Sequence, residues 1–421
     1  MNFLWFVALI FLLGGGLYFS IKLKFPQLKF FSLFKGINKN NTDGITPLSS
    51  LSMSLAARIG VGSLSGIALA IYLGGPGTIF WIWLSCIITS INSYCETYLA
   101  VKYQEKNNNE YVGGPAYYIS KGLNKKVLSK IYSVLIIITY IIGFISIQSN
   151  TIVISVNRLY NINCVIVSLV LVILSALVIL KGLNGIVNIT NKLVPVMGIG
   201  YIIISIIVIT SNLDKIPILF SSIFHSAFSF KSFGIGILST FLIGIQRGTF
   251  CTESGLGTGS IAASCTAPKD KISYSLMQII GIYFTVFVIC TATALIILTS
   301  DFKDFSLTNI NGIELTQHAF NYHLGSMGPI VLLMLVISLA YSTIIAGYYY
   351  GENNFLFLSK NKSNHIIILK LLTLLLIFIG GIASPKILWD IVDITVAILS
   401  IINMYVILKL RHIIIKDYKK L

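Results

Sequence analysis

The sequence predicts an all-α protein that crosses a membrane many times, and three observations carry this prediction. Hydrophobic residues make up 56% of the 421 residues, and the mean hydropathy is +0.88. Charged residues make up only 10%, against about 25% in soluble domains. The apolar residues also gather in runs of about 20, the length that a helix needs to cross the hydrocarbon core. The apolar excess must therefore face lipid, which excludes a soluble enzyme and a disordered chain.

Eleven apolar runs are long enough to be spanning helices. They cover residues 3–21, 47–72, 78–100, 128–156, 163–181, 186–210, 234–262, 273–299, 329–350, 365–382 and 387–408. The first run has no Lys or Arg before it and no small-residue cleavage pattern after it, so we expect a retained helix rather than a signal peptide. Shorter amphipathic pieces are expected in the gaps, at residues 26–36, 113–124, 216–230 and 313–324.

The basic residues indicate the orientation of these spans. The chain has 30 Lys and Arg against 14 Asp and Glu, a net charge of +16. They fall in the short gaps between apolar runs, which argues against nucleic-acid binding and for a topological role. With the N-terminus outside and the C-terminus in the cytoplasm, 23 fall inside, five outside and two, Arg58 and Arg247, within spans. This uneven distribution predicts eleven helices in the cell membrane. One span more or fewer would exchange inside and outside for the later segments and remove the excess of basic residues inside.

Two spans contain sequences that interrupt a helix. Span 47–72 includes RIGVGS (58–63), and span 234–262 includes RGTFCTESGLGTGS (247–260). Irregular backbone at membrane depth survives only when it is buried in protein or lines a watery cavity. Without the first helix, these are the first and sixth of ten spans, a pattern that indicates an alternating-access transporter with its site near the midplane. Close packing of small residues is the alternative, but it does not explain the adjacent charges.

At these residues the chain resembles the sodium:alanine (alanine or glycine:cation) symporter family. The resemblance covers residues 45–410 and rests on five segments in the right order. They are GIALAIYLGGPGTIFWIW (66–83), CETYLAVKYQEK (95–106), YVGGPAYYISKGL (111–123), RGTFCTESGLG (247–257) and YSTIIAGYYYGE (341–352). The resemblance implies a leucine-transporter-type fold, in which two five-helix inverted repeats form the core and the first and sixth core helices are broken. It also implies import of a small amino acid with a cation, usually Na⁺.

The implied architecture divides the chain into five parts. Residues 1–44 hold the extra N-terminal helix and a basic cytoplasmic amphipathic segment. The first repeat is expected at 45–211 and the second at 233–408, joined by an extracellular amphipathic connector at 212–232. A basic cytoplasmic tail follows at 409–421.

The chain departs from the family pattern at the expected site. Where the family usually has Gly-Thr-Gly-Asn, this chain has Gly60-Val61-Gly62-Ser63, and Arg58 replaces a small residue just before it. Where the family has Ser-Asn-Glu, this chain has CTE (251–253). Where the family usually has a Trp in the segment that corresponds to 341–352, this chain has Gly347. Because Trp is among the largest side chains, its loss predicts a larger pocket than is usual in the family, open to medium-sized amino acids.

The helix breaks are expected to hold the substrate. Unwinding frees N–H groups that can bind a carboxylate and carbonyl groups that can bind Na⁺. Gln148 matches a polar position of the family, and a buried amide both donates and accepts; for Gln148 and its neighbour Asn150 a bond between helices is the alternative. The expected substrate-binding residues are Gly60, Gly62, Ser63, Gln148, Gly255, Gly257, Thr258 and Gly347.

The coupling ion implied by the resemblance is Na⁺, and no other cofactor is expected. Its expected ligands are the hydroxyl groups of Ser342 and Thr343 and the freed backbone at Ala56 and Ile59. A hydroxyl group bonded to its own helix is the alternative for the first two. The six cysteines form no CxxC pair and lie in apolar surroundings, which supports neither a disulfide framework nor another metal site.

Three charged residues, Arg58, Arg247 and Glu253, are expected to act in gating or in charge pairs, because a charge at membrane depth is costly. Arg58 either pairs with Glu253 or Glu96, replaces the coupling cation, or contacts an anionic substrate. Arg247 and Glu253, six residues apart, are a second candidate pair. Glu96 and Asp393 are expected near the membrane faces, in capping or gating.

Competing functions remain at this point. The same fold coupled to protons, or exchanging solutes without sodium and possibly carrying a larger amino acid such as glutamine, is suggested by Arg58 and Ser63. A membrane-embedded enzyme would need a nucleophile–base pair or a metal cluster in a span, and neither is evident in the sequence. A channel is disfavoured because two offset broken helices suit an occluding site. The expected partners are a small amino acid and membrane lipid, with no nucleic acid and no obligatory protein partner.

Overall fold

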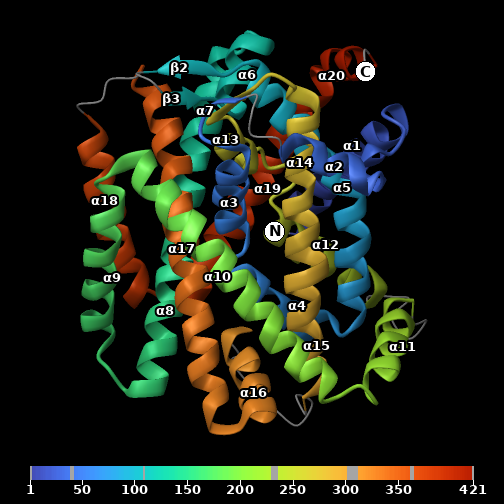
Figure 1. Ribbon diagram of the computed structural model, residues 1–421, viewed down its shortest axis with the longest axis vertical. Helices are drawn as coiled ribbons and strands as arrows, with labels where there is room; N and C mark the ends of the chain where they lie inside the picture. Colours follow the sequence, from blue (N-terminus) through green and yellow to red (C-terminus); the bar gives the residue numbers. More distant parts are fainter. Residues whose placement is uncertain are drawn as a thin grey trace.

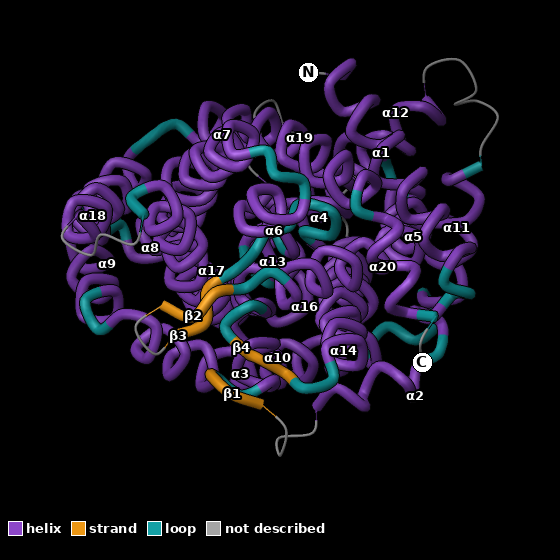
Figure 2. Tube along the Cα trace, turned by 90° about the horizontal axis from the view of Figure 1, so that it is seen from above, coloured by secondary structure: helices purple, strands orange, loops and turns teal. Residues whose placement is uncertain are grey.

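The structure is a computed structural model, and it is a helical bundle with two short β-ladders at one end (Figure 1). It describes residues 2–37, 42–107, 110–228, 236–300, 312–360 and 365–419. Viewed from that end, the helices surround the broken segments of the chain, and the four strands lie together near the rim (Figure 2).

The N-terminal half holds eleven described α-helices. They are α1 (Asn2–Lys22), α2 (Phe30–Leu33), α3 (Pro47–Arg58), α4 (Ser65–Gly74), α5 (Gly77–Lys102), α6 (Pro115–Gly122), α7 (Lys126–Ile137), α8 (Ile145–Tyr160), α9 (Cys164–Ile179), α10 (Gly182–Thr210) and α11 (Ile216–Ala227). Three 3₁₀ turns, η1 (Pro26–Leu28), η2 (Phe34–Ile37) and η4 (Val61–Ser63), lie between them. A π-helical segment, η5 (Ile138–Phe144), joins α7 and α8 into one continuous helix.

The C-terminal half holds nine more in the described part. They are α12 (Gly236–Thr252), α13 (Thr258–Ala263), α14 (Lys271–Tyr283), α15 (Thr291–Thr299), α16 (Gly312–Leu324), α17 (Gly328–Leu358), α18 (Ile366–Ile382), α19 (Pro385–Lys409) and α20 (Arg411–Tyr418). A second π-helical segment, η7 (Phe284–Cys290), joins α14 and α15, and a 3₁₀ turn, η9 (Gly325–Met327), precedes α17.

Local sequence explains where several helices begin. Thr46 caps α3 by accepting the Ser49 N–H at 3.2 Å, and Pro47 follows at the first helical position. Asp270 caps α14 in the same way, with its carboxylate accepting two backbone N–H groups at 3.1 Å. At the other end of a helix, Asn161 closes α8 in the left-handed conformation.

The long helices agree with most of the predicted spans. Seven are long and apolar enough to cross a membrane, and the bent pair formed by α3 and α4 makes an eighth. Three other predicted spans coincide with shorter helices: 163–181 with α9, 365–382 with α18, and 234–262 with α12 and α13. Residues 234 and 235 lie outside the described part. The chain is therefore a mostly helical multi-pass membrane protein, whereas the count of eleven spans stays a prediction.

The expected amphipathic pieces coincide with short helices. Residues 26–36 contain η1, α2 and the start of η2, and 113–124 contains α6. Helix α11 lies within 216–230, of which 229 and 230 are outside the described part, and α16 lies within 313–324 apart from its first residue.

The two β-ladders connect segments near the broken helices. Strand β1 (Thr42–Gly44) pairs antiparallel with β4 (Thr266–Pro268), so the segment before α3 is joined to the segment after α13. The Ile45 N–H donates to the Cys265 carbonyl at 3.2 Å beside this ladder. Strands β2 (Glu105–Asn107) and β3 (Glu110–Val112) form the other hairpin. The β1–β4 ladder thus ties the outer ends of the two broken helices together.

Candidate functional site

The first helix break lies at the predicted place. Helix α3 ends at Arg58, η4 forms a single turn, and α4 leaves at an angle of 59°. The Ser63 hydroxyl donates back to the Gly60 carbonyl at 2.8 Å. In this short interruption the last carbonyl groups of α3 lose their regular partners and become available to other groups.

Two side chains from distant helices converge on this break. Gln148 of α8 accepts the Val61 N–H at 3.0 Å through its Oε1. Thr343 of α17 donates to the Ala56 carbonyl at 2.8 Å and to the Leu339 carbonyl of its own helix at 3.0 Å. A Cβ atom added at Gly60 would lie 2.6 Å from Thr343 Oγ1 and 3.0 Å from both terminal atoms of Gln148. The structure therefore brings Gly60, Gln148, Thr343 and Ala56 together.

The remaining predicted residues near the first break differ in their contacts. Ser342 donates within its own helix, to the Leu339 carbonyl at 2.9 Å, and Ile59 is fully buried at the end of α3. Asn150, by contrast, donates to the Gly380 and Ala383 carbonyls at 3.1 and 2.8 Å. For Asn150 the alternative, a bond between helices, is what the structure shows.

Gly62 contacts the end of helix α12. A Cβ atom at Gly62 would lie 2.7 Å from the Phe250 ring, and the Cys251 thiol lies 3.4 Å from the Gly62 carbonyl as a donor. The Phe250 ring stacks on Phe144 with 4.8 Å between centroids. An aromatic surface from α12 and η5 therefore covers the first break.

The second break separates α12 from α13. It contains three residues with positive φ: Glu253 at 51°, Gly255 at 86° and Gly257 at 89°. Glycine adopts this region without a steric penalty, which explains two of the three residues. A non-glycine residue is strained there, and such strain concentrates at functional sites. Glu253 is fully buried, and its Oε2 accepts the Thr258 hydroxyl at 2.8 Å.

A polar network that the sequence analysis did not predict holds this second break. The Glu96 carboxylate accepts the Gly257 N–H at 2.9 Å and the Asn403 amide at 3.2 Å. Asn403 also donates to the Gly255 carbonyl at 2.9 Å. Two tyrosine hydroxyl groups complete the network. Tyr118 of α6 donates to the Asn403 side-chain oxygen, and Tyr132 of α7 donates to the Leu256 carbonyl.

The network places the second break against different helices from the first. The nearest atoms to Gly255 and Gly257 belong to α1, α5, α7, α19 and the start of α6, whereas those nearest Gly60 belong to α8 and α17. The residues that pack on Gly60 and on Gly255 and Gly257 are therefore different, whereas Gly259, just after the second break, packs on Arg58 at the end of α3. Polar side chains within the apolar runs, such as Asn403, were the signal that could have pointed to this network.

The expected enlargement of the pocket at Gly347 is not found. A Cβ atom at Gly347 would lie 3.2 Å from the Tyr140 ring, so this tyrosine occupies the space. Tyr140 comes from the π-helical segment η5, stacks on Phe144 at 4.8 Å and meets Tyr350 edge-on at 5.0 Å. The sequence comparison considered only the lost indole, and the compensating ring is 207 positions away along the chain.

Arg58 lies between two buried carboxylates without closing an ion pair. It is 2% exposed, and the hydrogen bond recorded for it goes to the Ser93 hydroxyl at 3.5 Å. The guanidinium interacts electrostatically with Glu96 and Glu253. Within the described part, however, neither carboxylate approaches it within 4.0 Å, and its Nε and Nη1 have no hydrogen-bond partner. The expected Arg58–Glu253 contact is thus electrostatic rather than a direct bond.

The predicted pairing of Arg247 with Glu253 is wrong. Arg247 instead forms two parallel bonds with Asp393 of α19, at 3.3 and 3.2 Å, in the geometry that suits a guanidinium and a carboxylate best. Its guanidinium also lies 5.0 Å from the centre of the Trp389 ring, a cation–π distance. Trp389 in turn contacts Phe250 at 5.0 Å.

A small crevice reaches the far side of this aromatic group. Trp389 and Ser65, the first residue of α4, lie in its wall together with Asn150 and Ile313. Ile313 belongs to α16, which lies at the end of the molecule opposite the β-ladders (Figure 1). Trp389, which contacts both Arg247 and Phe250, therefore borders the crevice, and Ser65 in the same wall lies two residues beyond the first helix break.

Comparisons with known proteins agree with this geometry. Residues 1–421 match the model of the sodium:alanine symporter family. The chain is 33% identical to the amino-acid carrier protein AlsT of Bacillus subtilis over 99% of this chain and 90% of that protein. It is 35% identical to the probable sodium/glutamine symporter GlnT of the same organism, over 98% of this chain and 88% of that protein. It is 32% identical to the sodium/alanine symporter AgcS of Methanococcus maripaludis, over 98% of this chain and 93% of that protein.

Proposed function

The chain belongs to the sodium:alanine symporter family, and from this premise we propose that it imports a small neutral amino acid, such as alanine or glycine, by symport with Na⁺. The relatives are transporters by name, not enzymes. The observation that carries the proposal is the convergence of Gln148 and Thr343 on the unwound segment at Gly60. This arrangement brings amide, hydroxyl and freed backbone groups together at a helix break, the kind of segment with which such transporters bind substrate and ion.

The proposed architecture has eleven spans, with the N-terminus outside and the C-terminus in the cytoplasm. Two five-helix repeats, 45–211 and 233–408, form the core, and their broken helices are the moving elements of alternating access. The support is the position of the two interruptions, the first and sixth of ten core spans, and the gathering of basic segments. Helices α6 and α20, which carry lysines, lie at the same end as the β-ladders (Figure 1).

The proposed substrate site is centred on the first break. Gly60, Gly62 and Ser63 supply backbone groups, and Gln148 supplies an amide. Gly255, Gly257 and Thr258 act from the second break, whose polar network with Glu96 must rearrange when α13 moves against α5. Gly347 lets the Tyr140 ring approach, so this ring limits the size of the substrate.

The proposed Na⁺ site lies beside the substrate site. Its ligands are the carbonyl groups freed at Ala56 and Ile59 and the hydroxyl groups of Ser342 and Thr343. The bond from Thr343 to Ala56 shows that the hydroxyl already reaches the end of α3. Hydroxyl and carbonyl oxygens are ligands of the hard type that alkali and alkaline-earth cations take.

The proposed gate toward the α16 end of the molecule is the Arg247–Asp393 pair with Trp389 and Phe250. This pair joins α12 to α19, and α19 also supplies Trp389 to the wall of the crevice. Opening of the site on this side requires the two side chains to part. Arg58, between Glu96 and Glu253, is proposed to couple the two broken helices.

Uptake by proteoliposomes tests the proposal. Radiolabelled alanine, glycine and glutamine are each offered with an inward Na⁺ gradient, with a proton gradient, and with unlabelled amino acid trapped inside. We expect accumulation only with the Na⁺ gradient. Uptake driven equally by the proton gradient or by trapped amino acid would favour the second candidate, a proton-coupled carrier or exchanger. That candidate is supported by a relative named a putative sodium/proton-dependent alanine carrier, 31% identical.

Replacing Thr343 by Ala is expected to weaken the dependence on Na⁺ more than substrate recognition. The change removes the hydroxyl that contacts Ala56 and leaves the carbonyl without this partner. A lost buried partner costs about 1–3 kcal/mol, which corresponds to a rise of roughly 5- to 150-fold in the half-saturating Na⁺ concentration. The matched controls are Thr343→Ser, which keeps the hydroxyl, and Thr373→Ala, a buried threonine that bonds only within α18. An unchanged Na⁺ curve in Thr343→Ala would remove this residue from the ion site.

Replacing Tyr140 by Ala is expected to widen the substrate range. Removal of the ring opens the space beside Gly347, so glutamine and other medium-sized amino acids should compete with labelled alanine about tenfold more effectively. Tyr140→Phe, which keeps the ring, should retain the parent selectivity. The measurement is the inhibition constant of each competitor in proteoliposomes. Unchanged inhibition constants in Tyr140→Ala would show that this ring does not border the substrate.

A further inference from the structure

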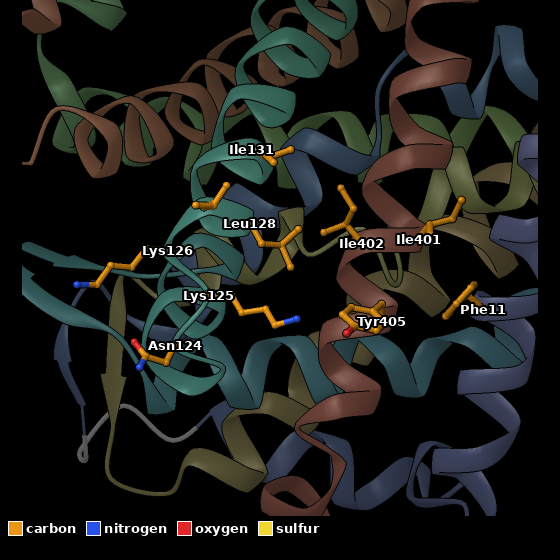
Figure 3. A pocket seen from close by; sticks show the side chains of 10 residues that line it. Phe11, Asn124, Lys125, Lys126, Leu128, Ile131, Ile401, Ile402 and Tyr405 are labelled. Atoms are coloured by element: carbon orange, nitrogen blue, oxygen red, sulfur yellow. The ribbon is translucent and has the colours of Figure 1, made fainter.

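A groove runs along the outside of the bundle between α1, α7 and α19 (Figure 3). Its volume is about 860 Å³, within the range of roughly 300–1,000 Å³ of small-molecule sites. It opens to the surface, because Val127 and Ile131 in its wall are 73% and 48% exposed. The groove shares no residue with the proposed substrate site, ion site or gate, so it calls for a separate explanation. The lining residues are Phe11, Asn124, Lys125, Lys126, Val127, Leu128, Ile131, Ile401, Ile402 and Tyr405.

The groove is apolar along its length and cationic at one end. Its walls are aliphatic and aromatic side chains of three helices, such as Phe11, Leu128 and Ile402. At the polar end, Lys125 Nζ lies 5.7 Å from the centre of the Tyr405 ring, and Lys409 Nζ, which is not among the lining residues, lies 5.6 Å from the centre of the same ring. Neither lysine has an ion-pair partner within the part of the chain that the structure describes. Two positive charges therefore lie against the same tyrosine ring, and neither is paired with a carboxylate in the described part.

Lys125, the N-terminal cap of α7, and Lys126, the first residue of α7, point in different directions. Lys125 extends across the groove toward Tyr405, whereas Lys126 turns away from it (Figure 3). The cationic end is thus made by Lys125 and Lys409 rather than by general surface charge. Lys130 provides a matched control, since it carries the same charge on α7 but does not line the groove.

We propose that this groove binds an anionic phospholipid, with an acyl chain along the apolar walls and the phosphate headgroup between Lys125 and Lys409. Basic pockets between transmembrane helices on the cytoplasmic side suit acidic headgroups, and tyrosine is typical of the membrane interface. In the proposed orientation the cationic end lies in the cytoplasmic leaflet, where anionic lipids concentrate. A zwitterionic lipid would fill the apolar walls equally well but would gain less from the two charges.

The position of the groove gives the lipid a route to the transport machinery. Its walls include Ile131 and Ile402, and the residues that follow them, Tyr132 and Asn403, hold the second helix break through the Leu256 and Gly255 carbonyls. A chain wedged between α7 and α19 would fix the separation of these two helices. The bound lipid is therefore expected to stabilise the network around the second break.

Native mass spectrometry of the full chain tests the proposal. Dioleoyl phosphatidylglycerol and dioleoyl phosphatidylcholine are titrated separately, and the apparent dissociation constant of the first bound lipid is measured. We expect tighter binding of phosphatidylglycerol. Because each lysine near a membrane surface contributes about 1 kcal/mol toward an anionic lipid, removing one charge should weaken binding about fivefold. The double change Lys125→Gln with Lys409→Gln should weaken it about 30-fold, with phosphatidylcholine binding unchanged within about twofold. Lys130→Gln, a loss of the same charge on α7 outside the groove lining, should match the parent protein.

A second variant tests the apolar part without touching the charges. Ile131→Trp places a large ring in the mouth of the groove and should weaken both lipids by about tenfold. Equal affinity of the parent protein for the two lipids would overturn the proposal. So would the same loss in Lys130→Gln as in Lys125→Gln, or no effect of Ile131→Trp. A dimer whose formation excludes lipid and which Ile131→Trp dissociates would overturn it as well.

Discussion

Replacing Arg58 by Ala is expected to reduce amino-acid uptake at least about 100-fold. Arg58 is the positive charge that interacts with both buried carboxylates, Glu96 and Glu253, and its removal leaves the two acids uncompensated. Stranding a buried charge costs about 3–5 kcal/mol, and each 1.4 kcal/mol corresponds to a factor of ten. Uptake is measured in proteoliposomes at equal amounts of reconstituted protein, with Arg411→Ala, at the exposed start of α20, as a matched loss of arginine.

A second substitution tests whether the lost charge balance causes the defect. In the double variant Arg58→Ala with Glu253→Gln, one uncompensated carboxylate is gone, and we expect uptake to recover by about tenfold or more. The variant Glu253→Gln alone should be impaired, because it removes one of the two negative charges that interact with Arg58. Recovery in the double variant beyond either single variant would demonstrate coupling between the two positions.

Substitution of Arg58 by Thr distinguishes two roles that the sequence left open for this residue: a substitute for the coupling cation, or a charge that balances the two acids. If the guanidinium stands in for a coupling cation, Arg58→Thr should retain uptake but depend more steeply on Na⁺ than the parent protein. If it only balances the two acids, Arg58→Thr should fail as Arg58→Ala does. Full activity in Arg58→Ala with an unaltered Na⁺ curve would contradict both roles and leave Arg58 as a residue without a part in transport.

Replacing Gly60 by Ala is expected to reduce uptake at least tenfold by steric exclusion alone. The added methyl group would lie 2.6 Å from the Thr343 hydroxyl and 3.0 Å from the Gln148 amide, so both side chains proposed to form the site must move. The backbone at Gly60, with φ of −111°, is open to any residue, so conformational strain does not contribute. Overpacking of this kind costs about 1–3 kcal/mol.

Gly66 gives a matched control for this prediction. It lies six residues further along the same broken helix and is buried, but nothing lies within 4 Å of a Cβ atom added there. Alanine in place of glycine also favours a helix by about 0.5–1 kcal/mol. Gly66→Ala should therefore retain uptake within about twofold of the parent protein, with no loss of stability. Equal loss in Gly60→Ala and Gly66→Ala would mean that the break tolerates no side chain anywhere, and the specific packing at Gly60 would not matter.

Composition and periodicity were sufficient for the general architecture. The apolar excess required a membrane protein, because so few charged side chains cannot cover a soluble surface. Glycine-rich segments beside charges located both helix interruptions, because glycine accepts backbone conformations that other residues resist. Gln148 and Thr343 were found through the resemblance to the family, at positions that its motifs mark. These features are local properties of the chain, and a sequence displays them directly.

The partners of the buried charges were decided only by the tertiary structure. Arg247 lies six residues from Glu253 but bonds to Asp393, which is 146 residues away. Arg58 faces two carboxylates and closes an ion pair with neither, and Tyr140 occupies the space that the loss of a Trp at Gly347 had suggested was open. Each outcome depends on how helices from distant parts of the chain approach one another within a few ångströms. Local pattern carries no such distances, because the separation and rotation of packed helices are set jointly by all the side chains between them.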